Sequence, residues 1–141
     1  MMNIAFFLLP KRDVVCLTPD TTLRQTLEKM EHHRFTSVPV LNEDGSYLGT
    51  ITEGDLLWFL KNNIQITFEN AHRHSLSEVP LRLQHQAVRI DATMEDLLKL
   101  VQTQNFVAVV DDTDRFIGIV RRSEVIDYCA KLILKDTPAR I

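Results

Sequence analysis

Two stretches of the chain carry one pattern, a β-branched run, an acidic turn and a glycine-containing return run. The first comprises Phe35-Thr36-Ser37-Val38-Pro39-Val40-Leu41 and Tyr47-Leu48-Gly49-Thr50-Ile51-Thr52-Glu53-Gly54-Asp55; the second comprises Phe106-Val107-Ala108-Val109-Val110 and Phe116-Ile117-Gly118-Ile119-Val120-Arg121-Arg122-Ser123-Glu124. Aligning Phe35 with Phe106 makes the second copy two residues shorter before its glycine. A repeat this short cannot bury a core alone, so we expect the copies to pack together and to form clefts at their junction.

Each copy predicts the order strand, helix, strand, strand, helix. In the first copy we expect an extended segment at 14–17, a helix that starts at a Thr22/Gln25 capping box, strands at 38–41 and 47–51, and a helix over 53–60. In the second we expect an extended segment at 87–90, a helix after Thr93, strands at 106–110 and 116–120, and a helix over 125–134. The predicted fold is α+β, with an N-terminal apolar segment (1–12), a first unit (13–60), a linker (61–84) with a short helix at 75–79, a second unit (85–134) and a tail (135–141).

Composition narrows the function classes. The chain of 141 residues has a net charge of −3, which argues against general nucleic-acid binding. The apolar run at 4–9 is too short to span a membrane, and we expect it to cover apolar surface instead. Cys16 and Cys129 show no metal-type spacing, and we read them as reduced thiols of a cytoplasmic protein. No catalytic constellation and no metal site is evident, so the chain is not expected to be an enzyme.

The repeated segments resemble CBS domains, the cystathionine-β-synthase-type motif that occurs in tandem pairs. The Val38-Pro39-Val40 run and the Gly49-x-x-Thr52-x-x-Asp55 segment carry the likeness, and in the second copy Ala108, Arg121 and Glu124 replace Pro39, Thr52 and Asp55. The chain resembles the stand-alone bacterial proteins that consist of such a tandem pair. The resemblance implies two β-α-β-β-α units packed through their sheets with pseudo-two-fold symmetry. It also implies a regulatory module that binds AMP, ATP, S-adenosylmethionine or cyclic di-AMP, often as a homodimer acting on an effector protein that the sequence does not identify.

Carried onto this chain, the resemblance implies two ligand sites. The first would use Thr52, Asp55, His85, Gln86, Ala87, Val88, Asn105, Phe106, Val107 and Ala108. The second, less favoured because of the replaced residues, would use Arg121, Arg122, Glu124, Asp13, Val14, Val15, Cys16, Phe35, Thr36, Ser37 and Val38. A carboxylate at position 55 suits a ribose, and the two arginines suit phosphate oxygens.

Several of these residues also have an explanation that involves no ligand. Thr52 and Asp55 also form a helix capping box, which explains both residues without a ligand. Arg121 and Arg122 also fit a solvated surface. The run 56–60 is apolar on all sides, which predicts a helix that packs on its own sheet and on a second subunit, although a tightly packed monomer would bury it too. The alternative function is a ligand-free dimerisation or protein-interaction module.

Overall fold

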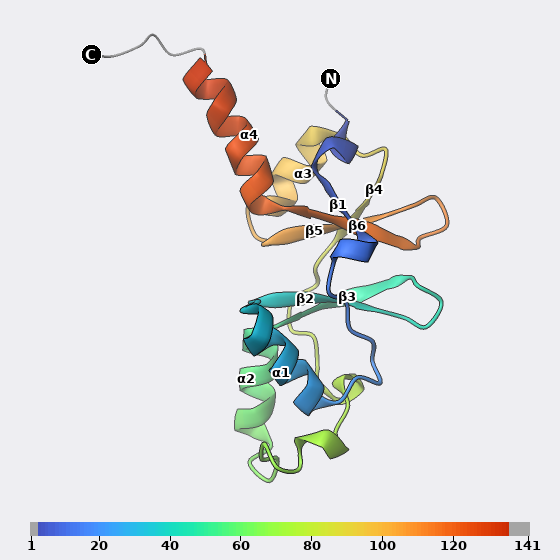
Figure 1. The fold of residues 1–141 in the computed structure, drawn as a ribbon, viewed down its shortest axis with the longest axis vertical. Coiled ribbons are helices and arrows are strands. Elements are labelled where there is room, and N and C mark those ends of the chain that lie inside the picture. The colour runs from blue at the N-terminus through green and yellow to red at the C-terminus, as the bar shows by residue number, and fades with distance from the viewer. Residues whose placement is uncertain (1–2, 136–141) are drawn as a thin grey trace, which may run out of the picture.

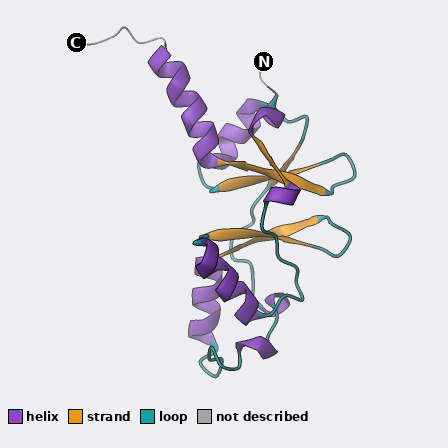
Figure 2. Ribbon diagram, in the orientation of Figure 1, coloured by secondary structure: helices purple, strands orange, loops and turns teal. Residues whose placement is uncertain are grey.

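Two units stacked sheet against sheet make up the structure, a computed structural model that describes residues 3–135 (Figure 1). The first unit contains α1 (Leu23–His33), β2 (Ser37–Leu41), β3 (Tyr47–Thr52) and α2 (Glu53–Asn62). The second contains β4 (Ala87–Arg89), α3 (Met94–Val101), β5 (Phe106–Val110), β6 (Phe116–Arg121) and α4 (Arg122–Lys135). Figure 2 shows the strands of both units meeting at the centre and the helices on the outer faces. The predicted α+β fold of two sheet-packed units is confirmed.

Capping boxes start three of the four α-helices. The hydroxyl oxygens of Thr22, Thr52 and Thr93 each accept a hydrogen bond from the backbone amide three residues later. In return, the side chain at that later position accepts from the threonine amide, so two otherwise unpaired donors are satisfied at each helix start. These local signals fix where α1, α2 and α3 begin and therefore where the preceding loops end.

The N-terminal apolar segment forms a strand in the sheet of the second unit. A 3-10 turn, Ile4–Phe7, leads into β1 (Leu8–Pro10), which pairs antiparallel with β6. The sheet order is β1-β6-β5-β4, and Ile4 is fully buried beneath it. At Gly118 the two strands come so close that a Cβ atom would lie 2.2 Å from the carbonyl oxygen of Leu9.

The corresponding sheet of the first unit is smaller. The extended segment predicted at 14–17 contributes a single bridge, in which the amide of Leu17 donates to the Pro39 carbonyl (3.0 Å) and the Leu41 amide donates to Leu17 (2.8 Å). The sheet itself therefore contains only β2 and β3. In the linker, the short helix predicted at 75–79 is a 3-10 turn, Leu76–Glu78. The linker then crosses β3, where the end of the Leu81 side chain lies against Gly49.

Buried side chains form three clusters. One fills each unit between its sheet and its helices, and the third lies between the two sheets. The buried members of this third cluster are Leu41, Phe106, Ala108, Phe116 and Ile119. None of the helices within residues 3–135 is long and apolar enough to cross a membrane. Residues 136–141 of the predicted tail lie outside the described residues.

Candidate functional site

The two hairpins correspond residue by residue. Val40 pairs with Gly49 between β2 and β3, and Val109 pairs with Gly118 between β5 and β6. Val109 and Gly118 therefore each lie 69 residues after the residue of the first hairpin that occupies the same position. Both hairpins also have an irregularity at the same position, directly after Val40 and Val109. The spacing is therefore constant, without the two-residue shortening that the aligned phenylalanines suggested.

The predicted equivalence of Phe35 and Phe106 is wrong for this reason. At a constant spacing of 69 residues, Gln104 occupies the position of Phe35. Thr36 and Asn105 are true counterparts, and they meet across the junction of the units, where Nδ2 of Asn105 donates to Oγ1 of Thr36 at 2.9 Å. Because it joins equivalent residues of the two units, this bond lies at their pseudo-two-fold axis.

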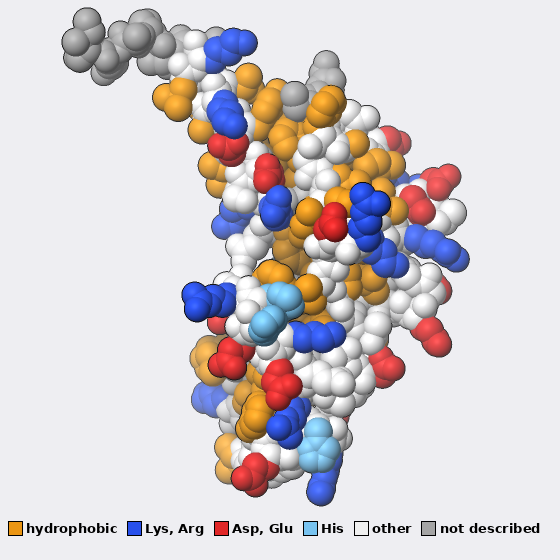
Figure 3. All heavy atoms as spheres, in the orientation of Figure 1, with side chains coloured by type: hydrophobic (Ala, Val, Ile, Leu, Met, Phe, Trp, Pro, Cys, Tyr) orange, Lys and Arg blue, Asp and Glu red, His pale blue; other side chains and the backbone are white. Residues whose placement is uncertain are grey.

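A cleft of about 420 Å³ opens between the units on one side of this axis. Its volume is in the range of about 300–1,000 Å³ that small-molecule sites occupy. Most of its wall is apolar, and charges come from one carboxylate and two guanidinium groups. The lining residues are Leu9, Asp13, Val14, Val15, Arg34, Phe35, Thr36, Ser37, Pro39, Asn105, Phe106, Ile119 and Arg121. Figure 3 shows the molecular outline narrowing between the two halves, with both apolar and charged side chains nearby.

Seven of the eleven residues predicted for the second site line this cleft, namely Asp13, Val14, Val15, Phe35, Thr36, Ser37 and Arg121. The other four lie outside it. Cys16 packs between the sheets and Val38 is buried in the core of the first unit. Nε of Arg122 donates to the Gln104 carbonyl at 3.0 Å, and Glu124 accepts from the guanidinium of Arg121 at 2.9 Å.

Within residues 3–135, the residues predicted for the first site are divided among separate hollows and the core, and Asp55 lines a hollow of about 260 Å³. Asn105 and Phe106 line the cleft just described. Ala87 and Val88 line a separate hollow of about 390 Å³ beside Tyr47. Val107 and Ala108 are buried in the core.

Asp55, the predicted ribose acceptor of the first site, has both oxygens engaged by the chain itself. The residue is 3% exposed. Oδ2 accepts from the Thr52 amide at 2.9 Å, and Oδ1 accepts from the Arg82 amide in the linker at 3.0 Å. A ligand hydroxyl would have to displace one of these bonds. The capping interpretation of Thr52 and Asp55 describes the contacts that the structure contains.

The backbone of Gln86 is engaged in the same way. Its amide donates to Oε1 of Gln104 at 2.8 Å, and its carbonyl accepts from Nε2 of Gln104 at 3.1 Å. Next to it, Nδ1 of His85 is the one buried side-chain nitrogen or oxygen within residues 3–135 that has no hydrogen-bond partner. Gln104 was missed by the sequence analysis, because the segment carried over from the resemblance began one residue later, at Asn105.

Arg34 was also missed by the sequence analysis, although its side chain lines the cleft. It caps the C-terminus of α1 with left-handed backbone angles (φ 56°, ψ 40°), and its amide donates to the carbonyls of Met30 and Glu31. Its guanidinium makes no salt bridge within residues 3–135. The side chain lines the cleft and also a groove between α1 and α2. The only sequence signal was a basic residue where a helix ends before a strand.

Burial raises the pKa of the Cys16 thiol to about 11, although the Lys11 ammonium opposes part of this effect. A thiol with such a pKa is protonated at neutral pH and is a poor nucleophile. Cys16 therefore supplies apolar packing near the cleft rather than a reactive group.

Comparisons with known proteins agree with this architecture. The CBS domain profile matches residues 8–62 and 77–131. A CBS domain-containing protein of Dictyostelium discoideum is 26% identical over 141 residues, which cover 94% of this chain and 95% of that protein.

Two solved structures have the same fold. CbpB of Listeria monocytogenes in complex with c-di-AMP has a TM-score of 0.80 at 20% identity, covering 94% of this chain and 98% of that one. CBSX2, a CBS-pair protein of Arabidopsis thaliana, in complex with AMP has a TM-score of 0.75 at 21% identity, covering 94% and 98%. Because the two profile matches span most of the chain and coincide with the two sheet-packed units, this protein belongs to the CBS-domain family and carries the domain as a tandem pair.

Proposed function

We propose that this chain is a regulatory module that binds an adenine nucleotide in the 420 Å³ cleft between its units. The observation that carries the proposal is the cleft itself, which combines apolar walls, free backbone groups and two guanidinium groups. The bound c-di-AMP and AMP in proteins of the same fold support the class of ligand. The proposal places the ligand at the second predicted site, because the Asp55 carboxylate and the Gln86 backbone of the first site are engaged by the chain.

The base would lie against the segment of Val14 and Val15. Within residues 3–135, the amide and carbonyl of Val15 have no hydrogen-bond partner. They can therefore form hydrogen bonds with an adjacent acceptor and donor on a base. Phe106 and Ile119 provide apolar surface on the side of the second unit. Apolar walls with a few placed polar groups are the usual composition of small-molecule sites.

The phosphates would lie near Arg34 and Arg121. The guanidinium group of Arg34 is unpaired within residues 3–135, whereas Arg121 is held by Glu124 in a half-exposed ion pair. Guanidinium groups bind phosphate oxygens in a bidentate manner. The carboxylate of Asp13 also lines the cleft and can accept from ribose hydroxyls.

Calorimetric titration tests the proposal with AMP, ATP, S-adenosylmethionine and cyclic di-AMP, with GMP as a control for the base. We expect at least one adenine ligand to bind more tightly than about 1 mM, the level that corresponds to roughly 4 kcal/mol. No such binding by any of the four would refute the proposal and favour the alternative, an interaction module without a ligand.

The role of Arg34 has a sharper test. Arg34→Ala should weaken AMP binding about 10- to 150-fold, the equivalent of about 1.5–3 kcal/mol for a charged hydrogen bond, and should leave adenosine binding unchanged. Arg24→Ala is the matched control, because Arg24 lies on the same helix and pairs with Glu28. Equal losses for AMP and adenosine would place the phosphate elsewhere.

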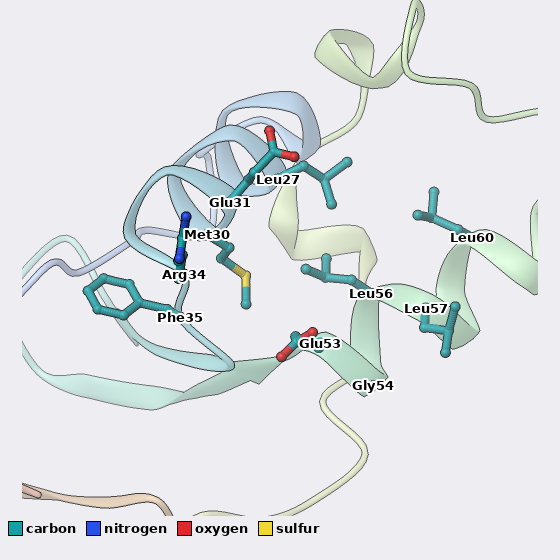
Figure 4. Close-up of a pocket in the computed structure, with 10 residues that line it drawn as sticks. All are labelled: Leu27, Met30, Glu31, Arg34, Phe35, Glu53, Gly54, Leu56, Leu57 and Leu60. Carbon is teal, nitrogen blue, oxygen red and sulfur yellow. The ribbon is translucent and has the colours of Figure 1, made fainter.

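A homodimer is part of the proposal. A groove of about 720 Å³ lies between α1 and α2, and Figure 4 shows Leu27, Met30 and Leu56 directed into it from the two helices. Glu31, Glu53 and Arg34 line the same groove and add charged groups to its apolar surface. Leu57 is 58% exposed there, and Leu57→Lys should convert the dimer to a monomer in sedimentation experiments. An unchanged sedimentation coefficient would exclude this face.

The regulatory step would be a change in how the two units pack when a ligand bridges them, read by an effector protein. We propose no catalytic activity and no catalytic cofactor, and the nucleotide acts as the regulatory ligand. The two cysteines are free, which supports a cytoplasmic location.

A further inference from the structure

Gln104 makes an unusual set of contacts for a buried polar side chain. It is 6% exposed, and its carboxamide oxygen accepts from the Gln86 amide while its carboxamide nitrogen donates to the Gln86 carbonyl. The same nitrogen also donates to the carbonyl of Phe106 at 3.3 Å. The carboxamide therefore binds both polar groups of one backbone residue.

The position of this contact follows from the internal symmetry. Leu17 bridges to Val40, and Val88 pairs with Val109, which is the counterpart of Val40. Leu17 and Val88 are therefore equivalent, and so are the residues two positions earlier, Val15 and Gln86. The backbone groups that are free in the cleft at Val15 are thus occupied in the other unit by Gln104.

The chemistry of the carboxamide matches that of adenine. Adenine presents an acceptor nitrogen beside the donating N6 amino group, and a carboxamide presents an acceptor oxygen beside a donating amino group. Both can bind the amide and carbonyl of one backbone residue at once. Phe35, the counterpart of Gln104, has no such groups and lines the open cleft.

We propose that Gln104 is an internal mimic of adenine that keeps the first predicted site closed, so that each chain binds a single nucleotide. This inference rests on the proposed function. A second contact supports the closure, because the linker amide of Arg82 occupies the carboxylate of Asp55. The pair of CBS units is therefore asymmetric, with one regulatory site and one self-occupied site.

The first test measures stoichiometry by native mass spectrometry and calorimetry with AMP. The wild-type chain should bind one AMP, and Gln104→Ala, which removes both side-chain bonds to the Gln86 backbone, should bind a second. Two AMP molecules on the wild-type chain would overturn the inference, and so would a single AMP on a folded Gln104→Ala variant. If AMP does not bind, the same stoichiometry is measured with whichever of ATP, S-adenosylmethionine and cyclic di-AMP does. Absence of binding by all four ligands would refute the proposed function, whereas the stoichiometry results concern the closure alone.

The reciprocal variant tests the mimicry without disturbing the buried glutamine. Phe35→Gln should let the new carboxamide bind the Val15 backbone and lower AMP affinity at least about 10-fold, an effect of about 1.4 kcal/mol. Phe35→Leu is the matched control, which removes the ring without adding an amide and should retain tighter binding than Phe35→Gln. Equal affinities in the two variants would overturn the mimicry.

A third measurement does not depend on stoichiometry. In NMR spectra of the wild-type chain, the side-chain amide signals of Gln104 should not move on addition of AMP, while the backbone amide of Val15 should shift. A shift of the Gln104 side-chain signals with no change at Val15 would show that the nucleotide enters the first site, and would overturn the closure.

Discussion

Gly118→Ala should destabilise the protein strongly, because it forces β1 away from β6. The added Cβ atom would lie 2.2 Å from the Leu9 carbonyl oxygen and 2.8 Å from a methyl carbon of Leu8. A backbone atom cannot rotate away, so the strand must move. Detachment of β1 would also expose Ile4, which is fully buried.

The magnitude follows from what β1 contributes. Exposure of Ile4 costs about 1.5–3 kcal/mol, and each lost backbone hydrogen bond costs about 0.5–1.5 kcal/mol, so we expect a loss of about 3–5 kcal/mol. Gly49→Ala is the control at the equivalent position; Gly118 has φ 158° and Gly49 has no positive φ, so part of the extra cost at Gly118 is backbone strain. At Gly49, the new Cβ would approach only the end of the flexible Leu81 side chain, at 2.6 Å, and the expected cost is about 1 kcal/mol or less.

Urea unfolding followed by circular dichroism gives the free energy of unfolding of both variants. The two should have similar slopes and clearly different midpoints. Because Leu9 also lines the cleft, Gly118→Ala should weaken AMP binding as well. If Gly49→Ala destabilises as much as Gly118→Ala, the close approach of β1 does not hold the second unit together, and this reasoning is refuted.

Two further predictions concern single side chains. Asp55→Ala should lower the free energy of unfolding by about 2–4 kcal/mol, because the amides of Thr52 and Arg82 lose their acceptor. The same variant should leave AMP affinity unchanged. A tenfold loss of affinity would instead place the ribose at Asp55. Cys16, with its pKa raised from 9.0 to about 11, should react with iodoacetamide at pH 8 about 100-fold more slowly than a thiol of pKa 9.0, since that is the ratio of thiolate fractions. The thiol of Cys16 loses its proton at a higher pH in the folded state than in the unfolded state. Cys16 therefore contributes stability below pH 9 that is lost as the pH rises from 9 towards 11. The free energy of unfolding of Cys16→Ala should lack this decline, and an identical decline in both proteins would refute the raised pKa of Cys16.

Local patterns in the sequence were sufficient for the hairpins and for the starts of α1, α2 and α3, whereas α4 begins at Arg122 and not at the predicted residue 125. The turn at Asp44-Gly45 and the capping boxes at Thr22, Thr52 and Thr93 are formed by residues close in sequence, so their structure can be predicted from neighbouring residues alone. The strand β1 was not predicted, because three apolar residues carry no period and their partner β6 lies more than 100 residues later.

The candidate sites depended on pairing that the sequence does not display. Phe35 and Phe106 are easily aligned because both are phenylalanines at the start of a strand segment. The strand register nevertheless makes Gln104 the counterpart of Phe35. Whether a polar group is free or already bonded is likewise a property of the packed chain. The sequence placed Asp55 beside a ligand, and only the position of the Arg82 amide shows that the carboxylate has a partner inside the protein.

The pairing of β1 with β6 also has a consequence for synthesis. Leu8–Pro10 leave the ribosome more than 100 residues before Gly118–Val120, the residues that receive them. At about 5–20 residues per second, these apolar side chains wait roughly 5–20 s without their sheet. During that interval they are available to chaperones or to a neighbouring nascent chain, whose own β6 offers the same edge. We therefore expect exchange of β1 between two molecules to be a route of misassembly for this chain.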